Sequence, residues 1–276
     1  MNYKDRKVIE ELEGIIGRKI PHVSEMKSDT FGVKVEHERV VALGLYKKRI
    51  KFLPESIGTL THLRHLYVHY NELESLPETI GNLTALQTLY VQNNQLKSIP
   101  ETIGNLETLH MFRLYSNQLT SLPERLWSLK NLVYFNAEGN ELTVLPESVG
   151  NLGDIIAVNF SSNQLTTVPE SIGNLRNLQY LYLYNNHLKT VPETIGNLKD
   201  LRKLRLSDNE LTFLPETIGN LKNLRKIYLE RNRLVSFPES IKNLVSLEEL
   251  HIEGNKITSL PEGLLPLKGQ GCSIFL

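Results

Sequence analysis

A period of 23 residues runs through most of this chain. Nine asparagines follow one another at that interval, at Asn71, Asn94, Asn117, Asn140, Asn163, Asn186, Asn209, Asn232 and Asn255. Ten prolines keep the same interval from Pro54 to Pro261. A unit this short cannot bury an apolar side alone, so each unit must stack against its neighbours. The period therefore predicts a solenoid rather than a fold around a single globular core.

Each unit has the same internal order, which the third copy shows. The alternation in Leu89–Val91 predicts a strand with one buried face, and stacked identical units place such strands side by side and parallel. Asn94 is expected to point inward and bond the backbone of a tight turn. After Pro100, the run Glu-Thr-Ile-Gly-Asn predicts a short helical or 3₁₀ turn that ends at a left-handed glycine, Gly104.

The repeated residues fit the consensus LxxLxLxxNxLxxLPxxIxxLxx, which Leu63–Ala85 meets. In this pattern the chain resembles the leucine-rich repeat family, most closely its 23-residue intracellular subclass of Ras-associated and plant-like members. The resemblance covers residues 40–265 as ten repeats. It implies an α/β solenoid shaped as a curved horseshoe, with a parallel sheet on the concave face, short turns on the convex face and capped ends. It also implies protein binding as a scaffold, with a small GTPase or signalling enzyme as partner.

The segments outside the repeats are expected to cap the two ends. Residues 1–39 form the predicted amino-terminal cap, and residues 266–276 form a carboxy-terminal cap or tail. The cap contains an apolar stripe at helical spacing, formed by Val8, Ile9, Leu12, Ile15 and Ile16 and stopped by Gly17. Phe31–Glu36 and Val40–Tyr46 read as two strands. A separate binding module is the alternative for this end.

Composition limits the function classes. Lysine plus arginine equal aspartate plus glutamate at 31 each, which argues against nucleic acid and anionic membranes as partners. The single Cys272 and a charged amino terminus lead us to expect a soluble, cytoplasmic chain. Without phosphate-loop, paired-cysteine or nucleophile-elbow motifs, we expect no enzyme, metal or cofactor. A hydrolase using Ser207, Asp208 and His251 is the weakest alternative.

Tyrosine marks the predicted partner surface. Ten of the eleven tyrosines fall at strand positions that alternate away from the core. Tyrosine and arginine concentrate binding energy at interfaces, although tyrosine also simply suits strands. A first patch is predicted from Tyr46, Tyr67, His69, Tyr70, Tyr90, Arg113 and Tyr115. A second patch is predicted from Tyr180, Tyr182, Tyr184, Arg205, Lys226, Tyr228 and Arg231.

Phenylalanine is expected to face inward instead. Phe112, Phe135 and Phe160 occupy core positions of strands, and Phe52, Phe213 and Phe237 are expected at inward turn positions.

The carboxy-terminal tail leaves two interpretations open. Cys272 is fifth from the end, whereas a prenylation box needs a cysteine that is fourth, so the motif fails as written. We expect the tail to form a lid made of Leu264, Leu265, Leu267, Ile274 and Phe275. Modification of Cys272, in a structural or membrane-tethered protein that acts through its tail, is the alternative.

Overall fold

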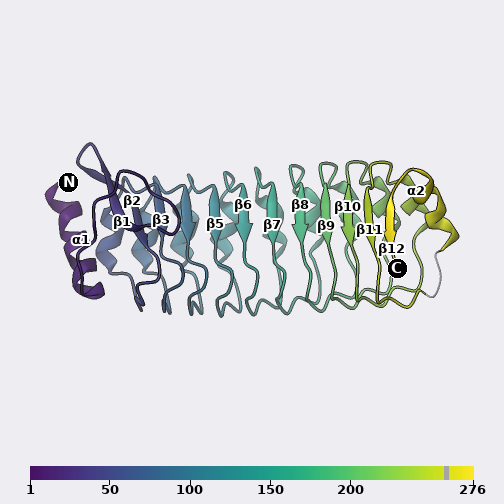
Figure 1. Ribbon diagram of the computed structural model, residues 1–276, viewed down its shortest axis with the longest axis horizontal. Coiled ribbons are helices and arrows are strands. Elements are labelled where there is room, and N and C mark those ends of the chain that lie inside the picture. Colours follow the sequence, from purple (N-terminus) through teal and green to yellow (C-terminus); the bar gives the residue numbers. More distant parts are fainter. Residues whose placement is uncertain (258–260) are drawn as a thin grey trace. The chain divides into compact units, whose positions relative to one another are not determined.

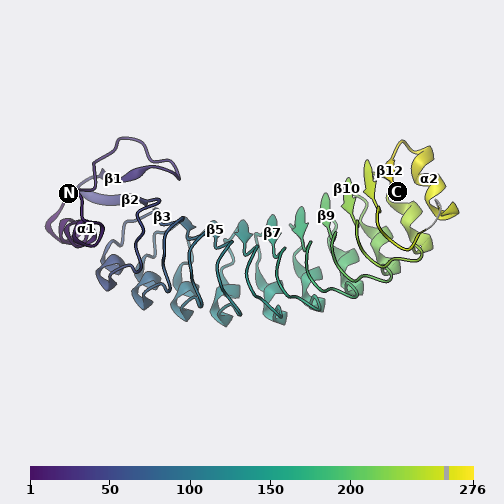
Figure 2. The same ribbon diagram turned by 60° about the horizontal axis from the view of Figure 1, so that its bottom comes forward.

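The computed structural model describes residues 1–257 and 261–276, so Leu260 of the last predicted Leu-Pro pair lies outside the described residues. The chain forms two compact units, Met1–Asn140 and Glu141–Leu276, and each is considered by itself. Both units repeat one motif of a short strand, a tight turn and a 3₁₀ turn. Each is therefore the predicted α/β solenoid, with parallel strands on one side and 3₁₀ turns on the other (Figure 1, Figure 2).

The strands of each unit follow chain order in its sheet (Figure 1). The first unit contains β1 (Phe31–Glu36), β2 (Arg39–Leu45), β3 (His65–Tyr67), β4 (Thr88–Tyr90), β5 (Met111–Arg113) and β6 (Tyr134–Asn136). The second contains β7 (Ala157–Asn159), β8 (Tyr180–Tyr182), β9 (Lys203–Arg205), β10 (Lys226–Tyr228), β11 (Glu249–His251) and β12 (Ser273–Phe275). Apart from the antiparallel β1–β2 hairpin, the pairs are parallel. Residues one period apart lie opposite each other, as Tyr67 and Tyr90 do.

The 3₁₀ turns begin directly after the repeated prolines. Those of the first unit are Glu55–Thr59, Glu78–Asn82, Glu101–Asn105 and Glu124–Ser128. Those of the second are Glu147–Asn151, Glu170–Asn174, Glu193–Asn197, Glu216–Asn220, Glu239–Asn243 and Glu262–Leu264. The repeated glycine is not left-handed, so that prediction was wrong. A Cβ at Gly81 would lie 2.4 Å from the Thr102 carbonyl oxygen, so glycine is needed because adjacent turns pack so closely.

The repeated asparagines bond inward, as predicted. Asn94 accepts from the Leu73 amide at 3.0 Å, and its side-chain amide donates to the carbonyls of Val91 at 2.9 Å and Val68 at 3.1 Å. Leu73 and Val68 belong to the preceding repeat, so each asparagine joins two repeats. The residue before it takes a left-handed conformation, with φ 54° at Asn93. This network explains why a polar residue lies in an otherwise apolar stack.

Aromatic residues divide between core and surface differently from the prediction. Phe112, Phe135 and Phe160 are completely buried, as expected. Phe52 and Phe213 are 54% and 52% exposed, and Phe237 is half-buried. The assignment of Phe52 and Phe213 to the core was wrong because the next residue in each case, Leu53 or Leu214, takes the inward position.

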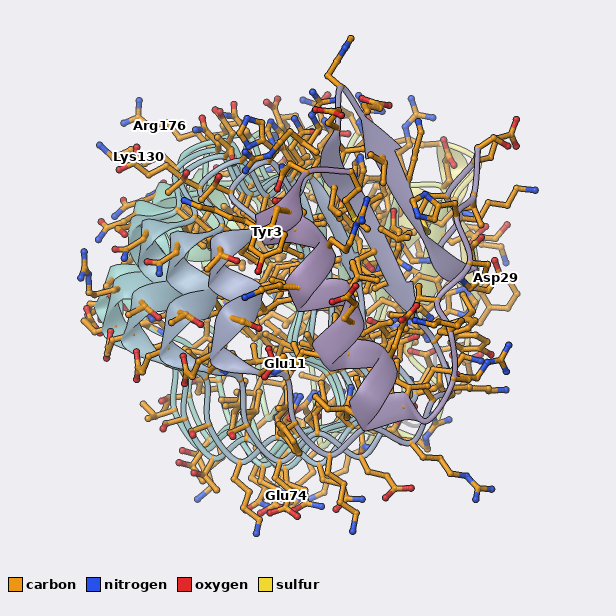
Figure 3. All side chains as sticks on the ribbon, turned by 90° about the vertical axis from the view of Figure 1, so that its left-hand side faces the viewer. Tyr3, Glu11, Asp29, Glu74, Lys130 and Arg176 are labelled. Carbon is orange, nitrogen blue, oxygen red and sulfur yellow. The ribbon has the colours of Figure 1, made fainter. Side chains whose placement is uncertain are left out.

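The amino-terminal end of the first unit is covered by helix α1 (Tyr3–Ile16) and the β1–β2 hairpin (Figure 3). The predicted helix is present and ends at Gly17, with φ 75°. Its residues Val8, Ile9 and Leu12 are buried. Buried Asp5 fixes the helix to β2 by accepting from the Val40 amide at 2.8 Å. The boundary at residue 39 between cap and repeats stays a prediction.

At the other end, the second unit finishes with helix α2 (Leu265–Gly269) and β12, which pairs in parallel with β11. Leu264 and Leu267 are buried and Ile274 is half-buried, whereas Leu265 and Phe275 are 51% and 42% exposed. Of the predicted lid residues, Leu264, Leu267 and in part Ile274 therefore cover the last repeat, whereas Leu265 and Phe275 stay exposed. Across the described residues, no helix combines the length and the apolar character needed to cross a membrane.

Candidate functional site

The strands present one sheet face away from the core, here called the open face. In β3, for example, Leu66 is buried between His65 and Tyr67, whose half-buried side chains lie on the open face. Predicted partner-binding residues follow the same alternation in other strands, as Tyr180 and Tyr182 do in β8 and Lys226 and Tyr228 in β10. Residues at the same position of successive repeats are called a column below. That these residues contact a partner stays a prediction, while the contacts among them come from the structure.

Most of the first patch is a continuous aromatic cluster, formed by the rings of Tyr46, Tyr67, His69, Tyr70 and Tyr90. The Tyr46 ring lies 4.8 Å from that of His69 and 5.6 Å from that of Tyr70, measured between centroids. Tyr67 and Tyr90 are 5.1 Å apart in an edge-to-face arrangement. His69 joins the two pairs, because its ring also lies 6.2 Å from Tyr90. Such ring contacts stabilise the positions of the rings relative to one another.

Two members of this patch are covered rather than displayed. His69 is 5% exposed and Tyr90 is 7% exposed, because neighbouring rings and Arg113 lie over them. Their prediction as contact residues is therefore corrected: they support the surface from below. Tyr70 is the most exposed predicted member, at 45%, while Tyr46, Tyr67, Arg113 and Tyr115 are half-buried.

Burial also controls ionisation in the first patch. Removal from water lowers the pKa of His69 to about 4, and the nearby Arg113 charge acts in the same direction. His69 is thus a neutral side chain at neutral pH. Burial raises the pKa of both Tyr67 and Tyr90, so these phenols keep their protons.

Arg113 lies between two tyrosines. Its guanidinium carbon is 4.5 Å from the ring centroid of Tyr90 and 5.3 Å from that of Tyr134. Among the residues that the structure describes, Arg113 makes no ion pair, and its Nε is buried without a hydrogen-bond partner. Tyr134 was not predicted as a site residue. Its place in the repeat could have indicated it, because residues at that place are predicted to lie on the open face.

The second patch repeats this arrangement. The Arg205 guanidinium carbon lies 4.8 Å from the Tyr184 centroid and 5.1 Å from that of Tyr228. Lys203, two positions earlier on β9, places its ammonium 4.9 Å from Tyr228 and 5.9 Å from Tyr182. Lys203 was also missed, although it shares a column with Lys226. Burial lowers its pKa, with the Arg205 charge as the next cause.

The other predicted cations of this patch are already matched by carboxylates. Lys226 lies 2.6 Å from Glu249, which also accepts from the Tyr228 hydroxyl at 3.1 Å. Arg231 makes a bidentate pair with Asp208. These two cations therefore join neighbouring repeats, whereas Arg205 makes no ion pair within residues 1–257 and 261–276.

The surroundings of Ser207, His251 and Cys272 support neither a hydrolase nor a protein that acts through a modified tail. The Ser207 hydroxyl donates to Glu230. His251 is stacked between Tyr228 and Phe275, at centroid distances of 4.6 and 4.2 Å. Cys272 is only 4% exposed, and burial raises the pKa of its thiol to about 11. The thiol is thus protonated and covered, which is unfavourable for modification.

A family model described as a leucine-rich repeat region matches residues 33–124 and 163–265. A comparison with curated protein sequences gives no match. Among solved structures, a leucine-rich repeat protein of Leptospira interrogans is 26% identical, with a TM-score of 0.56 over 85% of this chain and 83% of its own. The plant peptide hormone receptor RGFR1, in complex with RGF2, is 29% identical with a TM-score of 0.75. The Arabidopsis receptor kinase HAESA, in complex with the peptide hormone IDA and the co-receptor SERK1, is 26% identical with a TM-score of 0.72. Each receptor alignment covers 85% of this chain, which spans 39% and 42% of the respective receptor chains.

Proposed function

The chain belongs to the leucine-rich repeat family, and from that membership we propose that it binds a protein or peptide partner through the two tyrosine patches of its open face. The family fold generally serves as a protein-interaction scaffold rather than as an enzyme. The receptors RGFR1 and HAESA are both seen with peptide hormones, which supports a peptide or extended segment as the partner.

One observation carries the proposal. Arg113 and Arg205 are each held between two tyrosine rings, at 4.5 to 5.3 Å from the ring centroids, and neither has a carboxylate partner among the described residues. Stacking limits the rotamers of these long side chains, which reduces the entropy lost on binding. A guanidinium that is already oriented between two rings can bind a carboxylate, and the rings beside it can pack against an apolar side chain next to that carboxylate. We therefore propose a partner segment that combines acidic and apolar residues.

The test compares partner capture by the wild type with capture by Tyr182→Ala/Tyr184→Ala and by Arg113→Gln/Arg205→Gln. The matched control is Tyr3→Ala, which changes a tyrosine that is 70% exposed and lies on α1, away from the open face. Proteins captured by the wild type and by the control should be lost from both double variants. Equal capture by all four proteins, each shown to be folded, would remove the open face from the proposal.

We extend the proposal to an intracellular setting that includes small-GTPase or related signalling, because the one cysteine is a free thiol and the repeat resembles the intracellular subclass. Purified Ras-type GTPases, loaded with GDP or a non-hydrolysable GTP analogue, provide a direct binding assay. Deleting residues 269–276 tests the tail alternative: binding should persist, whereas a tail-driven protein would lose its cellular location.

A further inference from the structure

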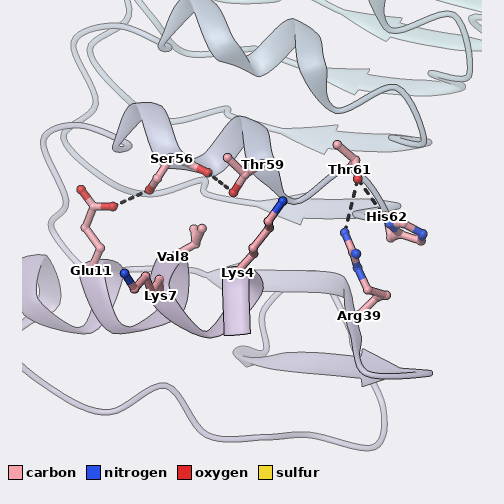
Figure 4. A pocket seen from close by; sticks show the side chains of 9 residues that line it. All are labelled: Lys4, Lys7, Val8, Glu11, Arg39, Ser56, Thr59, Thr61 and His62. Atoms are coloured by element: carbon pink, nitrogen blue, oxygen red, sulfur yellow. Dashed lines mark hydrogen bonds between the residues drawn. The ribbon is translucent and has the colours of Figure 1, made fainter. Parts of the chain in front are cut away.

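A groove separates α1 from the first 3₁₀ turn (Figure 4). Its volume is about 710 Å³. Lys4, Lys7, Val8 and Glu11 of α1 line one side, and Ser56, Thr59, Thr61 and His62 supply the other. All of these residues belong to the first unit, and none is part of the tyrosine patches.

The groove exists because α1 lies next to the first 3₁₀ turn, where the 3₁₀ turn of a preceding repeat would otherwise pack. Elsewhere the turns bond to one another: the Thr79 hydroxyl donates to the Glu55 carbonyl of the preceding turn at 2.7 Å. Ser56 occupies the equivalent position in the first turn and donates to the Glu11 carboxylate of α1 instead. Space remains between α1 and the turn beside this contact, and Val8, which is 2% exposed, lies at its base.

The charges around this space are unequal. Lys4 reaches from α1 toward Thr59, and Lys7 lies along α1 near Glu11 (Figure 4). In the part of the chain that the structure describes, neither ammonium group makes an ion pair. The Lys7 ammonium lies 4.7 Å from the Tyr3 ring centroid. Glu11 is the only carboxylate among the described lining residues, and it already accepts from Ser56. Positive charge is thus in excess.

Arg39 and His62 complete the far wall. The Arg39 guanidinium lies 3.5 Å from buried Asp5 and donates to the Thr61 hydroxyl at 3.4 Å. That hydroxyl lies 3.3 Å from His62 Nδ1. Arg39 is therefore fixed and its charge is matched by Asp5, which leaves Lys4 and Lys7 as the cations available to a ligand.

The lining between these charges is mostly carbon, from Val8, the methyl groups of Thr59 and Thr61 and the lysine stems. The volume is within the roughly 300–1,000 Å³ typical of small-molecule sites. We propose that this groove binds a small amphiphilic anion, a single-chain carboxylate dissolved in water. Its head would contact Lys4 and Lys7, and its chain would lie along Thr59, Thr61 and the lysine stems, with the buried Val8 beneath it.

Displacement of 8-anilinonaphthalene-1-sulfonate, a fluorescent amphiphilic anion, tests the proposal with the full chain. Dodecanoate should displace the dye, whereas inorganic phosphate, which has no chain, and dodecanol, which has no charge, should do so at least tenfold less well. Lys4→Gln/Lys7→Gln should weaken dodecanoate binding at least tenfold. The control Lys97→Gln/Lys130→Gln, which changes two exposed lysines of the same unit outside the groove, should bind normally.

The location is tested by methyl NMR. Dodecanoate should shift the methyl signals of Val8, Thr59 and Thr61, and the open-face variant Tyr182→Ala/Tyr184→Ala should bind it normally, so this result is independent of partner capture. Four outcomes would overturn the proposal: unchanged affinity in the Lys4/Lys7 variant, an equal loss in the lysine control, methyl shifts confined to other sites, or binding only to dodecanoate held in phosphatidylcholine vesicles.

Discussion

Arg205 and Tyr228 lie directly opposite each other on neighbouring strands, and the guanidinium carbon is 5.1 Å from the ring centroid. The first unit contains the same cross-strand pair in reverse order, where Tyr90 lies opposite Arg113 at 4.5 Å. In both cases the 23-residue period brings a cation and a ring into register. Stacking then leaves the planar cation at the surface, with its orientation fixed.

Arg205→Gln should lower the free energy of unfolding by about 0.5–2 kcal/mol, because it removes the cation from two tyrosine rings. Urea denaturation of the purified protein measures this change. The control Arg202→Gln alters an exposed arginine at the start of the same repeat and should change stability by less than about 0.5 kcal/mol. Similar losses in the two variants would show that stacking on Tyr184 and Tyr228 does not stabilise the fold.

Asn94→Ala should destabilise the first unit by about 2–4 kcal/mol. It removes the hydrogen bonds to the Leu73 amide and to the Val68, Val91 and Gln92 carbonyls. The Leu73 amide is left without a partner in the interior, whereas the Val68 and Val91 carbonyls keep the bonds donated by Asn71 and Asn117. Chemical denaturation should show an earlier transition, and hydrogen exchange should become faster at the Leu73 amide. Gln95→Ala changes the exposed neighbour and serves as the control. If Asn94→Ala and Gln95→Ala both unfold at the same denaturant concentration as the wild type, the interior asparagines are not required for stability.

His69 should make stability depend on pH. Its pKa is lowered from 6.5 to about 4 in the folded protein, so the unfolded chain takes up the proton first as pH falls. The contribution is fully present above pH 6.5 and is lost progressively between about pH 6.5 and 4, up to about 3 kcal/mol. Urea titrations across this range should show a shallower pH dependence for His69→Gln than for the wild type. The exposed His62→Gln control should keep the wild-type slope.

Cys272 should react slowly in the native protein. Its thiol is buried and its pKa is raised to about 11, so little thiolate is available at pH 8. Labelling with a disulfide reagent should be at least about 100-fold slower in buffer than in urea, following the thiolate fraction and access. Deleting residues 273–276 removes β12 and should accelerate the reaction. Rapid labelling of the intact native chain would favour the tail alternative, in which Cys272 is available for modification.

Much of the fold could be predicted because every repeat meets the same neighbours. The alternation in Leu89–Val91, the inward Asn94 and the turn after Pro100 each depend on residues within one repeat or at the same position in the next. Stacking identical units then leaves little freedom in register. The helix of the cap was predictable for a similar reason, since its apolar spacing and Gly17 are local signals.

From the sequence, the site could be predicted only as a set of repeat positions that face away from the core. His69 and Tyr90 occupy predicted open-face positions, but side chains from neighbouring strands cover them. Tyr134 and Lys203 were overlooked because their importance comes from contacts with Arg113 and Tyr228. Phe52 is likewise exposed because the backbone turns the adjacent Leu53 inward instead. Position along the sequence does not specify such contacts.

The sequence by itself determined the period, the parallel strands, the asparagine turns and the face on which tyrosine gathers, because these follow from repetition and from the alternation of side chains along a strand. Only the tertiary structure decided which of those side chains remain accessible and which cations lack a carboxylate. It also decided that a groove remains between α1 and the first turn. These properties depend on packing between different elements, where the volume and charge of one side chain determine the space and solvent left to another.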